Sequence, residues 1–305
     1  MLHRHPASEY RGLTNLSVLC AFVVNQPAYI PWAALISLVL LGCSASHPKQ
    51  ELRVCSDPNN LPFSNRAGEG LENHLAQLIA GELRAGVTYT WWPQRRGFIR
   101  STLAADSCDV VMGIPTGSER VLTTRPYYRS SYVFVSRKDR HLDITSFDDP
   151  ALKKLKIGVQ LVGDDYNNTP PVHALSRRGI VGNLEGFSVY GDYSQANPPA
   201  RIIDAVVSGA VDIAVAWGPL AGYFARRSGT QLDVVPVSPA YDPPGLRFAF
   251  DISLGVRPGD QALKQRLEGV LDRRRSGIDS LLAEFGFPLA QSPDSGSTGR
   301  GQPAS

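Results

Sequence analysis

The sequence has little net charge and no long run of charges of one sign. Its 305 residues include 31 lysines and arginines and 28 aspartates and glutamates, for a formal net charge of +3. The one dense basic cluster, Arg273–Arg275, is typical of a solvated helix end, where cations interact favourably with the helix dipole. A nucleic-acid-binding protein is expected to carry a basic stripe. The composition therefore argues against a nucleic-acid partner.

Motifs for metal binding and catalysis are also lacking. Beyond residue 46, no cysteines or histidines are paired at the spacing of metal ligands. No motif places a nucleophile beside a general base, and no internal repeat recurs at a solenoid period. We therefore expect no metal, no other cofactor and no enzymatic activity. An enzyme on this scaffold would have to use acidic residues such as Asp57, Glu119 or Asp165 as acid or base.

The first 46 residues differ from the rest and indicate a leader. Ala33–Gly42 is an apolar run that is too short to span a bilayer and is typical of a secretory signal. The residues ending at Cys43 resemble a lipoprotein signal, in which this cysteine would be lipidated, and cleavage after Ser46 is the alternative. A further apolar stretch at 16–24 is explained equally by a misassigned start codon or a second membrane segment. We expect export to the periplasm, with membrane contact only through such a lipid.

The mature chain alternates strand and helix patterns, which indicates an α/β fold. Strand patterns at 52–55, 87–91 and 108–113 surround a helical repeat of leucines that begins at Leu71. A second set of such patterns follows, and two strand crossings predict a two-lobed fold with a two-segment hinge. The predicted parts are lobe 1 at 51–138 plus 247–289, lobe 2 at 142–238, crossings near 131–139 and 235–248, and a disordered tail at 290–305.

Three loops of lobe 1 are expected to meet in one crevice. In an open α/β sheet, ligands bind outside the carboxyl ends of the strands. The loops at 57–63, 92–96 and 115–120 each follow a predicted strand. The candidate ligand contacts in these loops are Asp57, Asn60, Phe63, Trp92, Arg95 and Thr116.

The loop Trp91–Arg96 has an unusual composition, because it contains two tryptophans and two arginines. Both residue types are enriched at interaction hot spots. The loop could therefore form a stacking or anion-binding surface for a planar ligand or a protein partner. The alternative, in which one tryptophan lies in the core and both arginines are solvated, remains open.

Cys55 and Cys108 are the two cysteines of the mature chain. An oxidising compartment permits a disulfide between them. However, Cys55 ends its predicted strand and Cys108 begins its own, while bridged Cα atoms must lie within about 7 Å of each other. A disulfide and two buried free thiols both remain open.

Ordered motifs run through most of the mature chain. They include Asp57–Phe63, Gly70–Asn73, Cys108–Gly113, Ser118–Arg120, Pro126–Tyr128, Lys156–Gln160, Val211–Val215 and Glu284–Gly286. Their order is similar to that of the periplasmic solute-binding proteins of the type II fold. The segments Val54–Gly70, Trp91–Phe98, Leu122–Ser130 and Trp217–Tyr223 resemble, more narrowly, the MoxJ/XoxJ group of binding-protein homologues associated with quinoprotein methanol dehydrogenases. This resemblance implies a periplasmic accessory role in assembling or activating such a dehydrogenase.

The type II resemblance also implies roles for positions in lobe 2 and after the third strand. Arg120 stands where amino-acid binders hold a ligand carboxylate, which suits a planar guanidinium; pairing with a neighbouring acid is the alternative. The position that holds the ligand ammonium has Trp217, which cannot neutralise an ammonium as a carboxylate does. Gln160 and Asp164 complete the predicted cleft, and Asp164 with Asp165 argues against an anion there.

Three functions follow from these features. The favoured one is a non-catalytic accessory or maturation factor of a methanol or alcohol dehydrogenase that depends on pyrroloquinoline quinone (PQQ). The alternative is a solute-binding receptor that delivers a small polar or anionic ligand to an ABC permease. An enzyme, such as a periplasmic dehydratase, is the least supported.

Overall fold

The computed structural model describes residues 50–162, 168–188 and 193–291. The predicted leader with Cys43, the turn with Asp164 and the tail beyond Gln291 lie outside the described residues. Among the helices of the described part, none is long and apolar enough to cross a membrane.

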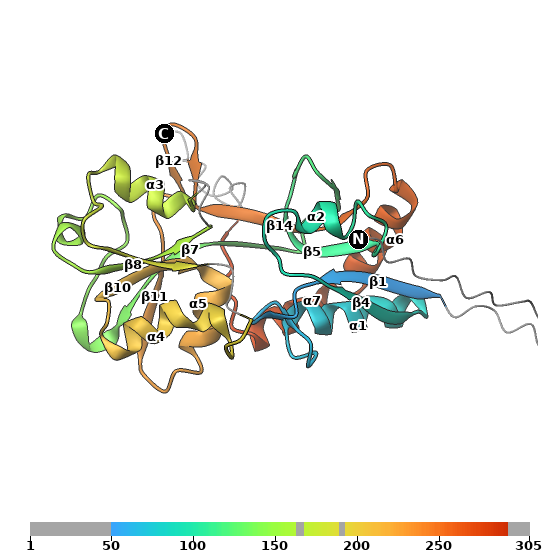
Figure 1. Ribbon diagram of the computed structural model, residues 1–305, viewed down its shortest axis with the longest axis horizontal. Coiled ribbons are helices and arrows are strands. Elements are labelled where there is room, and N and C mark those ends of the chain that lie inside the picture. Colours follow the sequence, from blue (N-terminus) through green and yellow to red (C-terminus); the bar gives the residue numbers. More distant parts are fainter. Residues whose placement is uncertain (1–49, 163–167, 189–192, 292–305) are drawn as a thin grey trace, which may run out of the picture. The chain divides into compact units, whose positions relative to one another are not determined.

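Lobe 1 is built on one half of a ten-stranded sheet. Its elements are β1 (Glu51–Ser56), β2 (Asn59–Asn60), β3 (Ser64–Asn65), α1 (Leu71–Leu83), β4 (Gly86–Trp91), α2 (Phe98–Ser101), β5 (Val110–Pro115), β6 (Leu122–Thr123), β14 (Ala249–Val256), α6 (Gln261–Arg273) and α7 (Arg275–Glu284). The strand order in this half is β4-β1-β5-β14, with β1 parallel to β4 and β5 and β14 antiparallel to β5. Helices α1, α6 and α7 pack on one another, and α1 and α6 also contact strands of this half (Figure 1).

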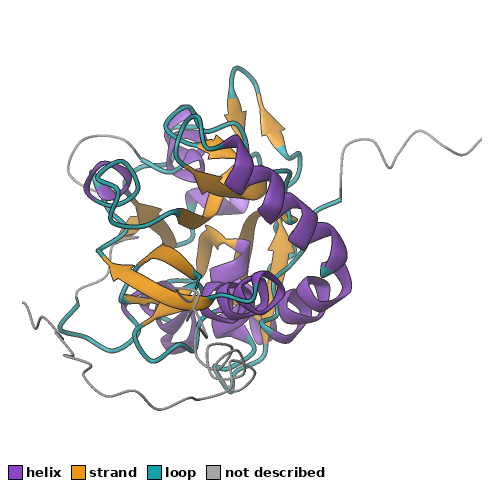
Figure 2. Cartoon of the chain, turned by 90° about the vertical axis from the view of Figure 1, so that its right-hand side faces the viewer, coloured by secondary structure: helices purple, strands orange, loops and turns teal. Residues whose placement is uncertain are grey.

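Lobe 2 is built on the other half of the sheet. Its elements are η1 (Lys138–Arg140), η2 (Pro150–Lys153), β8 (Ile157–Leu161), α3 (Pro170–Arg177), β9 (Leu184–Ser188), η3 (Pro198–Ala200), α4 (Arg201–Ser208), β10 (Ile213–Trp217), α5 (Gly218–Ala225), β11 (Leu232–Pro236), β12 (Tyr241–Asp242) and β13 (Leu246–Arg247). Strand β8 lies between β10 and β9 and is parallel to both. The short β12–β13 hairpin extends outward at the top of Figure 2.

The strands of lobe 2 are apolar on both faces because a core lies on each side of them. Ile213 and Val215 of β10 pack in one core with Leu175 of α3, whereas Ala214 and Ala216 pack in the other with helix α4. Successive side chains of a strand point to opposite faces, so a strand covered on both faces reads as a continuous apolar run. This explains the sequence of β10 and places α3 and α4 on opposite sides of the sheet, as in Figure 1.

Strand β7 (Tyr128–Arg137) belongs to both halves of the sheet. Its first part, 128–131, pairs antiparallel with β14, and its remainder, 132–137, pairs antiparallel with β10 and β11. The chain returns to lobe 1 through the segment that leads into β14. These two crossings confirm the predicted two-lobed fold with a two-segment hinge.

Helix α5 provides another contact between lobe 2 and the core of lobe 1. Tyr223 of α5 stacks on Phe285, with ring centroids 5.7 Å apart. Gly222 is required at this contact, because a Cβ atom there would lie against the carbonyl oxygen of Gly286. The C-terminal segment therefore packs directly on the backbone of α5.

Cys55 and Cys108 form a disulfide, with their Cα atoms 5.4 Å apart. Cys55 lies in β1, and Cys108 precedes the neighbouring parallel strand β5 by two residues. The pairing is possible because β1 and β5 lie side by side, with Cys55 opposite Val111. Of the two alternatives left by the sequence, the structure contains the disulfide.

Candidate functional site

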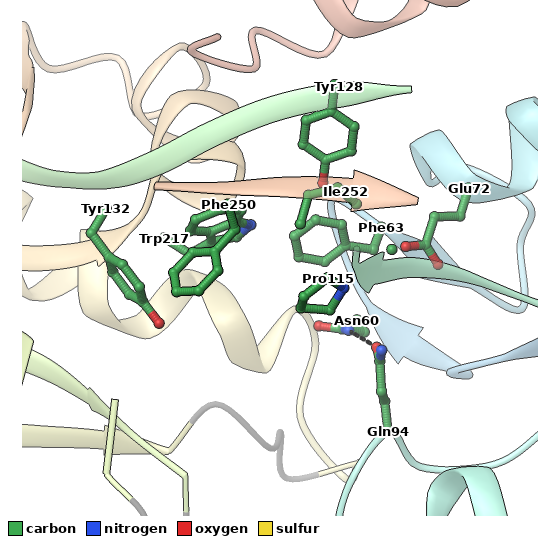
Figure 3. A pocket seen from close by; sticks show the side chains of 11 residues that line it. Asn60, Phe63, Glu72, Gln94, Pro115, Tyr128, Tyr132, Trp217, Phe250 and Ile252 are labelled. Atoms are coloured by element: carbon green, nitrogen blue, oxygen red, sulfur yellow. Dashed lines mark hydrogen bonds between the residues drawn. The ribbon is translucent and has the colours of Figure 1, made fainter. Parts of the chain in front are cut away.

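A cavity of about 290 Å³ lies between the two lobes, where several strands end. Asn60 and Phe63 follow β1, Gln94 follows β4, Pro115 ends β5 and Trp217 ends β10. This is the carboxyl edge at which open α/β sheets bind ligands. The described residues that line it are Asn60, Phe63, Glu72, Gln94, Gly113, Pro115, Tyr128, Tyr132, Trp217, Phe250 and Ile252 (Figure 3).

The aromatic wall of the cavity follows from strand register. Tyr128 and Tyr132 are four residues apart on β7, so their side chains lie on the same face of the strand. Tyr128 pairs with Ile252 of β14, and Tyr132 pairs with Trp217 of β10. Phe250 is two residues from Ile252 and joins the same face. The wall therefore combines side chains from both halves of the sheet.

These rings pack against one another. Tyr132 meets Trp217 edge to face with centroids 5.4 Å apart, and Trp217 meets Phe250 in the same way at 6.1 Å. Burial raises the pKa of Tyr132 and, more strongly, that of Tyr128 above the ordinary value of 10. Both phenols are therefore neutral at physiological pH, and this wall carries no charge.

Glu72 lies at the opposite end of the cavity from Trp217 (Figure 3). It belongs to the first turn of α1, and Gly70 positions this turn because a Cβ atom on Gly70 would collide with the backbone of Phe63. Gly113, with φ +69°, allows the carboxyl group to approach closely, because a Cβ atom on Gly113 would come within hard-contact range of Glu72 Oε1. Local backbone constraints on both sides thus place this acid.

The Glu72 carboxyl group is buried and has no hydrogen-bond partner among the described residues. The side chain is only 6% exposed, and no described residue donates a hydrogen bond to its carboxyl oxygens. Burial, with a smaller contribution from the negative charge of Asp57, raises the pKa of Glu72 to about 8. Desolvation disfavours the charged form of an acid, so Glu72 is mainly protonated at neutral pH.

Asp57 is buried too, but its carboxyl group is fully engaged in hydrogen bonds. Oδ1 accepts a hydrogen bond from the Asn59 N–H at 2.8 Å, and Oδ2 accepts one from the Gln94 N–H at 2.6 Å and one from the Tyr193 hydroxyl at 2.7 Å. Tyr193 follows β9 of lobe 2, and the Asn59 side chain donates to the nearby Gln195 carbonyl at 2.9 Å. These hydrogen bonds join the two lobes on this side.

Several predicted ligand contacts lie at the cavity or support it. Asn60, Phe63 and Trp217 line it, and Asp57 accepts a hydrogen bond from the N–H of Gln94, another lining residue. Gln160 is buried and its Oε1 accepts a hydrogen bond from the Trp217 N–H at 2.8 Å, so it orients the end of β10.

Other predicted contacts lie elsewhere. Trp92, Arg95 and Arg120 are exposed and are not among the described residues that line the cavity. Thr116 is also outside the lining and contacts the Ser253 hydroxyl at 2.6 Å. Asp164 is outside the described residues. A ligand-binding role for each of these residues stays a prediction.

Sequence reasoning missed Glu72 and most of the aromatic wall. Glu72 is part of the Gly70–Asn73 motif, but its place in the first turn of an amphipathic helix is also typical of a solvated acid. Tyr128 lines the cavity from β7, the strand that crosses between the lobes. The spacing of Tyr128 and Tyr132 on one strand was the available signal.

The chemistry of this cavity is that of an apolar binding site with one acid. Among the described lining residues, Glu72 is the only acid and there is no lysine, arginine or histidine. Within the described part of the chain, no group of three or more His, Cys, Asp or Glu side chains is placed to hold a metal ion. The arrangement can enclose an apolar group and offer it one carboxyl group.

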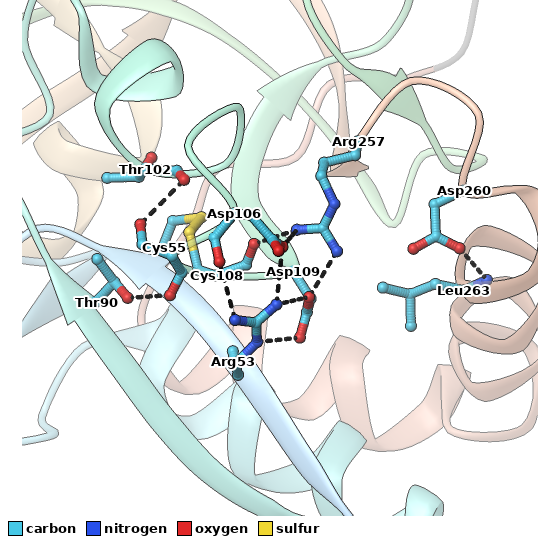
Figure 4. A network of polar contacts seen from close by, with 11 residues as sticks. Arg53, Cys55, Thr90, Thr102, Asp106, Cys108, Asp109, Arg257, Asp260 and Leu263 are labelled. Carbon is cyan, nitrogen blue, oxygen red and sulfur yellow. Dashed lines mark hydrogen bonds and ion pairs between the residues drawn. A yellow bond between two sulfur atoms is a disulfide. The ribbon is translucent and has the colours of Figure 1, made fainter.

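A second polar cluster lies at the amino ends of β1 and β5, away from the cavity (Figure 4). Asp109 Oδ1 accepts hydrogen bonds from Arg53 at 2.6 Å and from Arg257 at 2.7 Å, and its Oδ2 accepts a further one from Arg53 at 2.8 Å. Arg257 also donates to the Cys108 carbonyl at 2.5 Å. The cluster joins β1, the start of β5 and the end of β14, which makes it a structural feature of lobe 1.

Comparison with known proteins identifies relatives along nearly the whole chain, although no protein-family model matches it. Protein MoxJ of Methylorubrum extorquens is 33% identical over 288 residues, which cover 91% of this chain and 92% of that protein. Protein MoxJ of Paracoccus denitrificans is 29% identical over 259 residues, covering 79% and 90%. Among solved structures, the periplasmic binding protein XoxJ of Methylobacterium extorquens AM1 matches with 37% identity and a TM-score of 0.65, over 79% of this chain and 100% of that one.

Replacing Glu72 tests the unpaired carboxyl group through the pH dependence of stability. Its pKa rises on folding from the ordinary 4.5 to about 8, so the folded state keeps a proton that the unfolded state loses between these values. Stability contributed by this site therefore falls as the pH rises from about 4.5 to about 8, by on the order of 4 kcal/mol. Glu72→Gln is expected to flatten this decline and to raise the Tm at pH 8.5 by several degrees.

The control for this experiment is Glu69→Gln, which changes an exposed glutamate three residues before Glu72 in the sequence. Thermal unfolding from pH 5 to pH 9 compares the three proteins. The same pH dependence in Glu72→Gln and the wild type would contradict the assignment.

Replacing Asp109 tests the second cluster. Hydrogen bonds, first from Arg53 and then from Arg257, hold the pKa of Asp109 below its ordinary 3.8. Its contribution is therefore present at neutral pH and declines as the pH falls below about 4. Asp109→Asn is expected to lower the free energy of unfolding in urea at pH 7 by about 1–3 kcal/mol.

Asp139→Asn is the matched control, because Asp139 forms an exposed ion pair with Arg137 and such pairs contribute little. If both variants lost equal stability, or if the loss in Asp109→Asn did not shrink at pH 3, the cluster would not have the role described.

Proposed function

The chain belongs to the MoxJ family, and we propose that it is a periplasmic, non-catalytic binding protein that acts as an accessory or maturation factor of a PQQ-dependent methanol or alcohol dehydrogenase. The observation that carries this proposal is the extent of the match, 91% of this chain and 92% of MoxJ. The resemblance of the sequence to the group associated with quinoprotein methanol dehydrogenases supplies the class of partner.

The periplasmic location is supported by the name of XoxJ, which is a periplasmic binding protein 37% identical to this chain. The same name supports a binding rather than a catalytic role. The proposal includes two alternatives for the mature N-terminus. In one, the chain begins at a lipidated Cys43, and in the other it is cleaved after Ser46. Mass spectrometry of the protein isolated from membranes and from the periplasm separates them.

A receptor for an ABC transporter is less well supported by the cavity. An amino-acid receptor of this fold would need a cation for the ligand carboxylate and an acid for its ammonium. Arg120, the candidate for the first role, is exposed outside the described lining, and Trp217 occupies the position of the second. The described lining therefore has no cation for the ligand carboxylate, and the position expected to hold the ammonium has no acid.

The loop between β4 and α2 is the surface best suited to a protein partner. Trp92 is 42% exposed there and lies two residues from Gln94, which lines the cavity. Arg95 of the same loop is exposed as well. Exposed tryptophan with arginine is the composition of an interface hot spot, so we place the contact with the dehydrogenase on this loop.

Complex formation tests the accessory role directly. The purified mature chain is expected to co-sediment with the PQQ-dependent methanol dehydrogenase of the same organism in analytical ultracentrifugation. A strain without the gene is expected to have reduced dehydrogenase activity that returns on complementation. Absence of a complex with both the apo and the PQQ-loaded enzyme, together with normal activity in the deletion strain, would refute the proposal.

Trp92→Ala tests the location of the partner surface. The substitution is expected to weaken dehydrogenase binding at least about tenfold, because truncating a hot-spot tryptophan removes roughly 2 kcal/mol or more. The matched control is Val181→Ala, which shortens a side chain that is 60% exposed on lobe 2. Calorimetry of each variant with the enzyme measures the change. Unaltered binding by Trp92→Ala, or equal weakening by the control, would place the interface elsewhere.

A further inference from the structure

The cavity contains one buried acid that the accessory role does not use. Glu72 is more than nine-tenths buried, points into the cavity and receives no hydrogen bond from any described residue (Figure 3). A buried polar group normally has a partner, since leaving it unsatisfied is costly. The carboxyl group of Glu72 therefore faces the cavity and is available to a group that enters it.

The remaining polar atoms of the lining favour a hydrogen-bond donor as that group. The Asn60 amide N–H donates to Gln94 Oε1 at 3.0 Å, which leaves the Asn60 carbonyl oxygen as a second acceptor beside the cavity. Tyr132 adds a hydroxyl group on the opposite side. A carboxyl group and a carbonyl oxygen together suit a ligand with several N–H donors.

The walls favour a positive charge with an apolar substituent. The rings of Phe63, Tyr128, Tyr132, Trp217 and Phe250 surround the space in front of Glu72 (Figure 3). Aromatic faces attract ammonium groups, with tryptophan the most effective, and the attraction is larger at a desolvated site. The same rings provide apolar surface for hydrocarbon.

The lining also argues against two other kinds of ligand that carry a positive charge, α-amino acids and metal ions. An α-amino acid carries a carboxylate, and no lysine, arginine or histidine of the described lining could neutralise it. Ca²⁺ and Mg²⁺ prefer six or more oxygen ligands, and the described lining offers one carboxyl group. The volume of about 290 Å³ is at the lower end for small-molecule sites, so the occupant is small.

We propose that this cavity binds a small protonated amine with an apolar alkyl or aryl substituent, its ammonium group on Glu72 and its hydrocarbon against the aromatic wall. This site goes beyond the accessory function proposed above and does not depend on it. The ligand class is a free organic amine without a carboxylate.

Binding of such an amine is coupled to loss of a proton from Glu72, whose pKa is about 8. The ionisable groups that face it are Asp57, Tyr89, Tyr127 and Tyr128. Burial raises the pKa values of the three tyrosines above 10, so they remain neutral below pH 9. The affinity for an ammonium ion should therefore rise between pH 6 and pH 8.5, by up to about tenfold per pH unit.

Isothermal titration calorimetry of the purified mature chain tests the proposal. The probes are benzylamine, cyclohexylamine and butylamine, each compared with the corresponding alcohol. Phenylglycine, which is benzylamine with an added carboxylate, tests the effect of that group. At least one amine is expected to bind about tenfold or more tightly than its alcohol. Phenylglycine is expected to bind more weakly than benzylamine. At pH 6.5, titration in buffers with different ionisation enthalpies should detect release of close to one proton per bound amine.

Glu72→Gln is expected to reduce amine affinity at least about tenfold and to abolish proton release, while Glu69→Gln retains both. If Glu72→Gln does not fold, the pH dependence and the proton release of the wild type still decide the question, and Trp217→Leu should weaken amine binding as a second variant.

Three results would overturn the site: no amine binds more tightly than its alcohol, Glu72→Gln binds amines as well as the wild type, or affinity falls as the pH rises. The last would mean that protonated Glu72 donates to a neutral acceptor. None of these experiments contains a dehydrogenase, so their failure leaves the accessory role untouched, and failure of complex formation leaves this site untouched.

Discussion

The pairing of β7 with β14 in one lobe and with β10 in the other fixes the position of the cavity's aromatic side chains. Side chains alternate along a strand, so a slip of one residue would turn Tyr128 and Tyr132 to the opposite face. The same register places Ile252 opposite Tyr128 and Trp217 opposite Tyr132. A binding wall that crosses the hinge is therefore a property of the sheet. Relative motion of the lobes must bend this strand, and it alters the distances between the rings as it does so.

Two carboxyl groups of lobe 1, those of Asp109 and Asp57, help to hold the structure together, whereas that of Glu72 does not. Asp109 and Asp57 each accept three hydrogen bonds from described residues, from Arg53 and Arg257 in the first case and from Asn59, Gln94 and Tyr193 in the second. Glu72 accepts none from the described part of the chain. This contrast distinguishes the acids that stabilise the fold from the acid that faces the cavity. The proposed ligand site at Glu72 and the proposed partner surface at Trp92 are separate parts of this MoxJ-family protein.

Much of the architecture could be predicted from the sequence because it depends on local periodicity. The leucine spacing predicted α1, the strand patterns predicted β1, β4 and β5, and the two strand crossings predicted the hinge. The residues that line the cavity could not all be predicted, because periodicity does not give the distances between elements that are far apart in the sequence. Arg120 follows β5 as predicted, yet its turn leaves it exposed. Glu72 is concealed in an ordinary first helical turn, and its burial depends on Gly113, a residue 41 positions away. Pairing of Cys55 with Cys108 could not be decided because strand ends alone do not fix the separation of two Cα atoms.

Carbon-13 NMR of the protein labelled at glutamate side-chain carboxyl carbons measures the central feature of this account without any partner or ligand. One carboxyl resonance, absent from the Glu72→Gln variant, is predicted to titrate near pH 8. A spectrum in which the Glu72 resonance titrates near 4.5, the ordinary value of a glutamate, would contradict the account, because the acid would then be solvated or already paired.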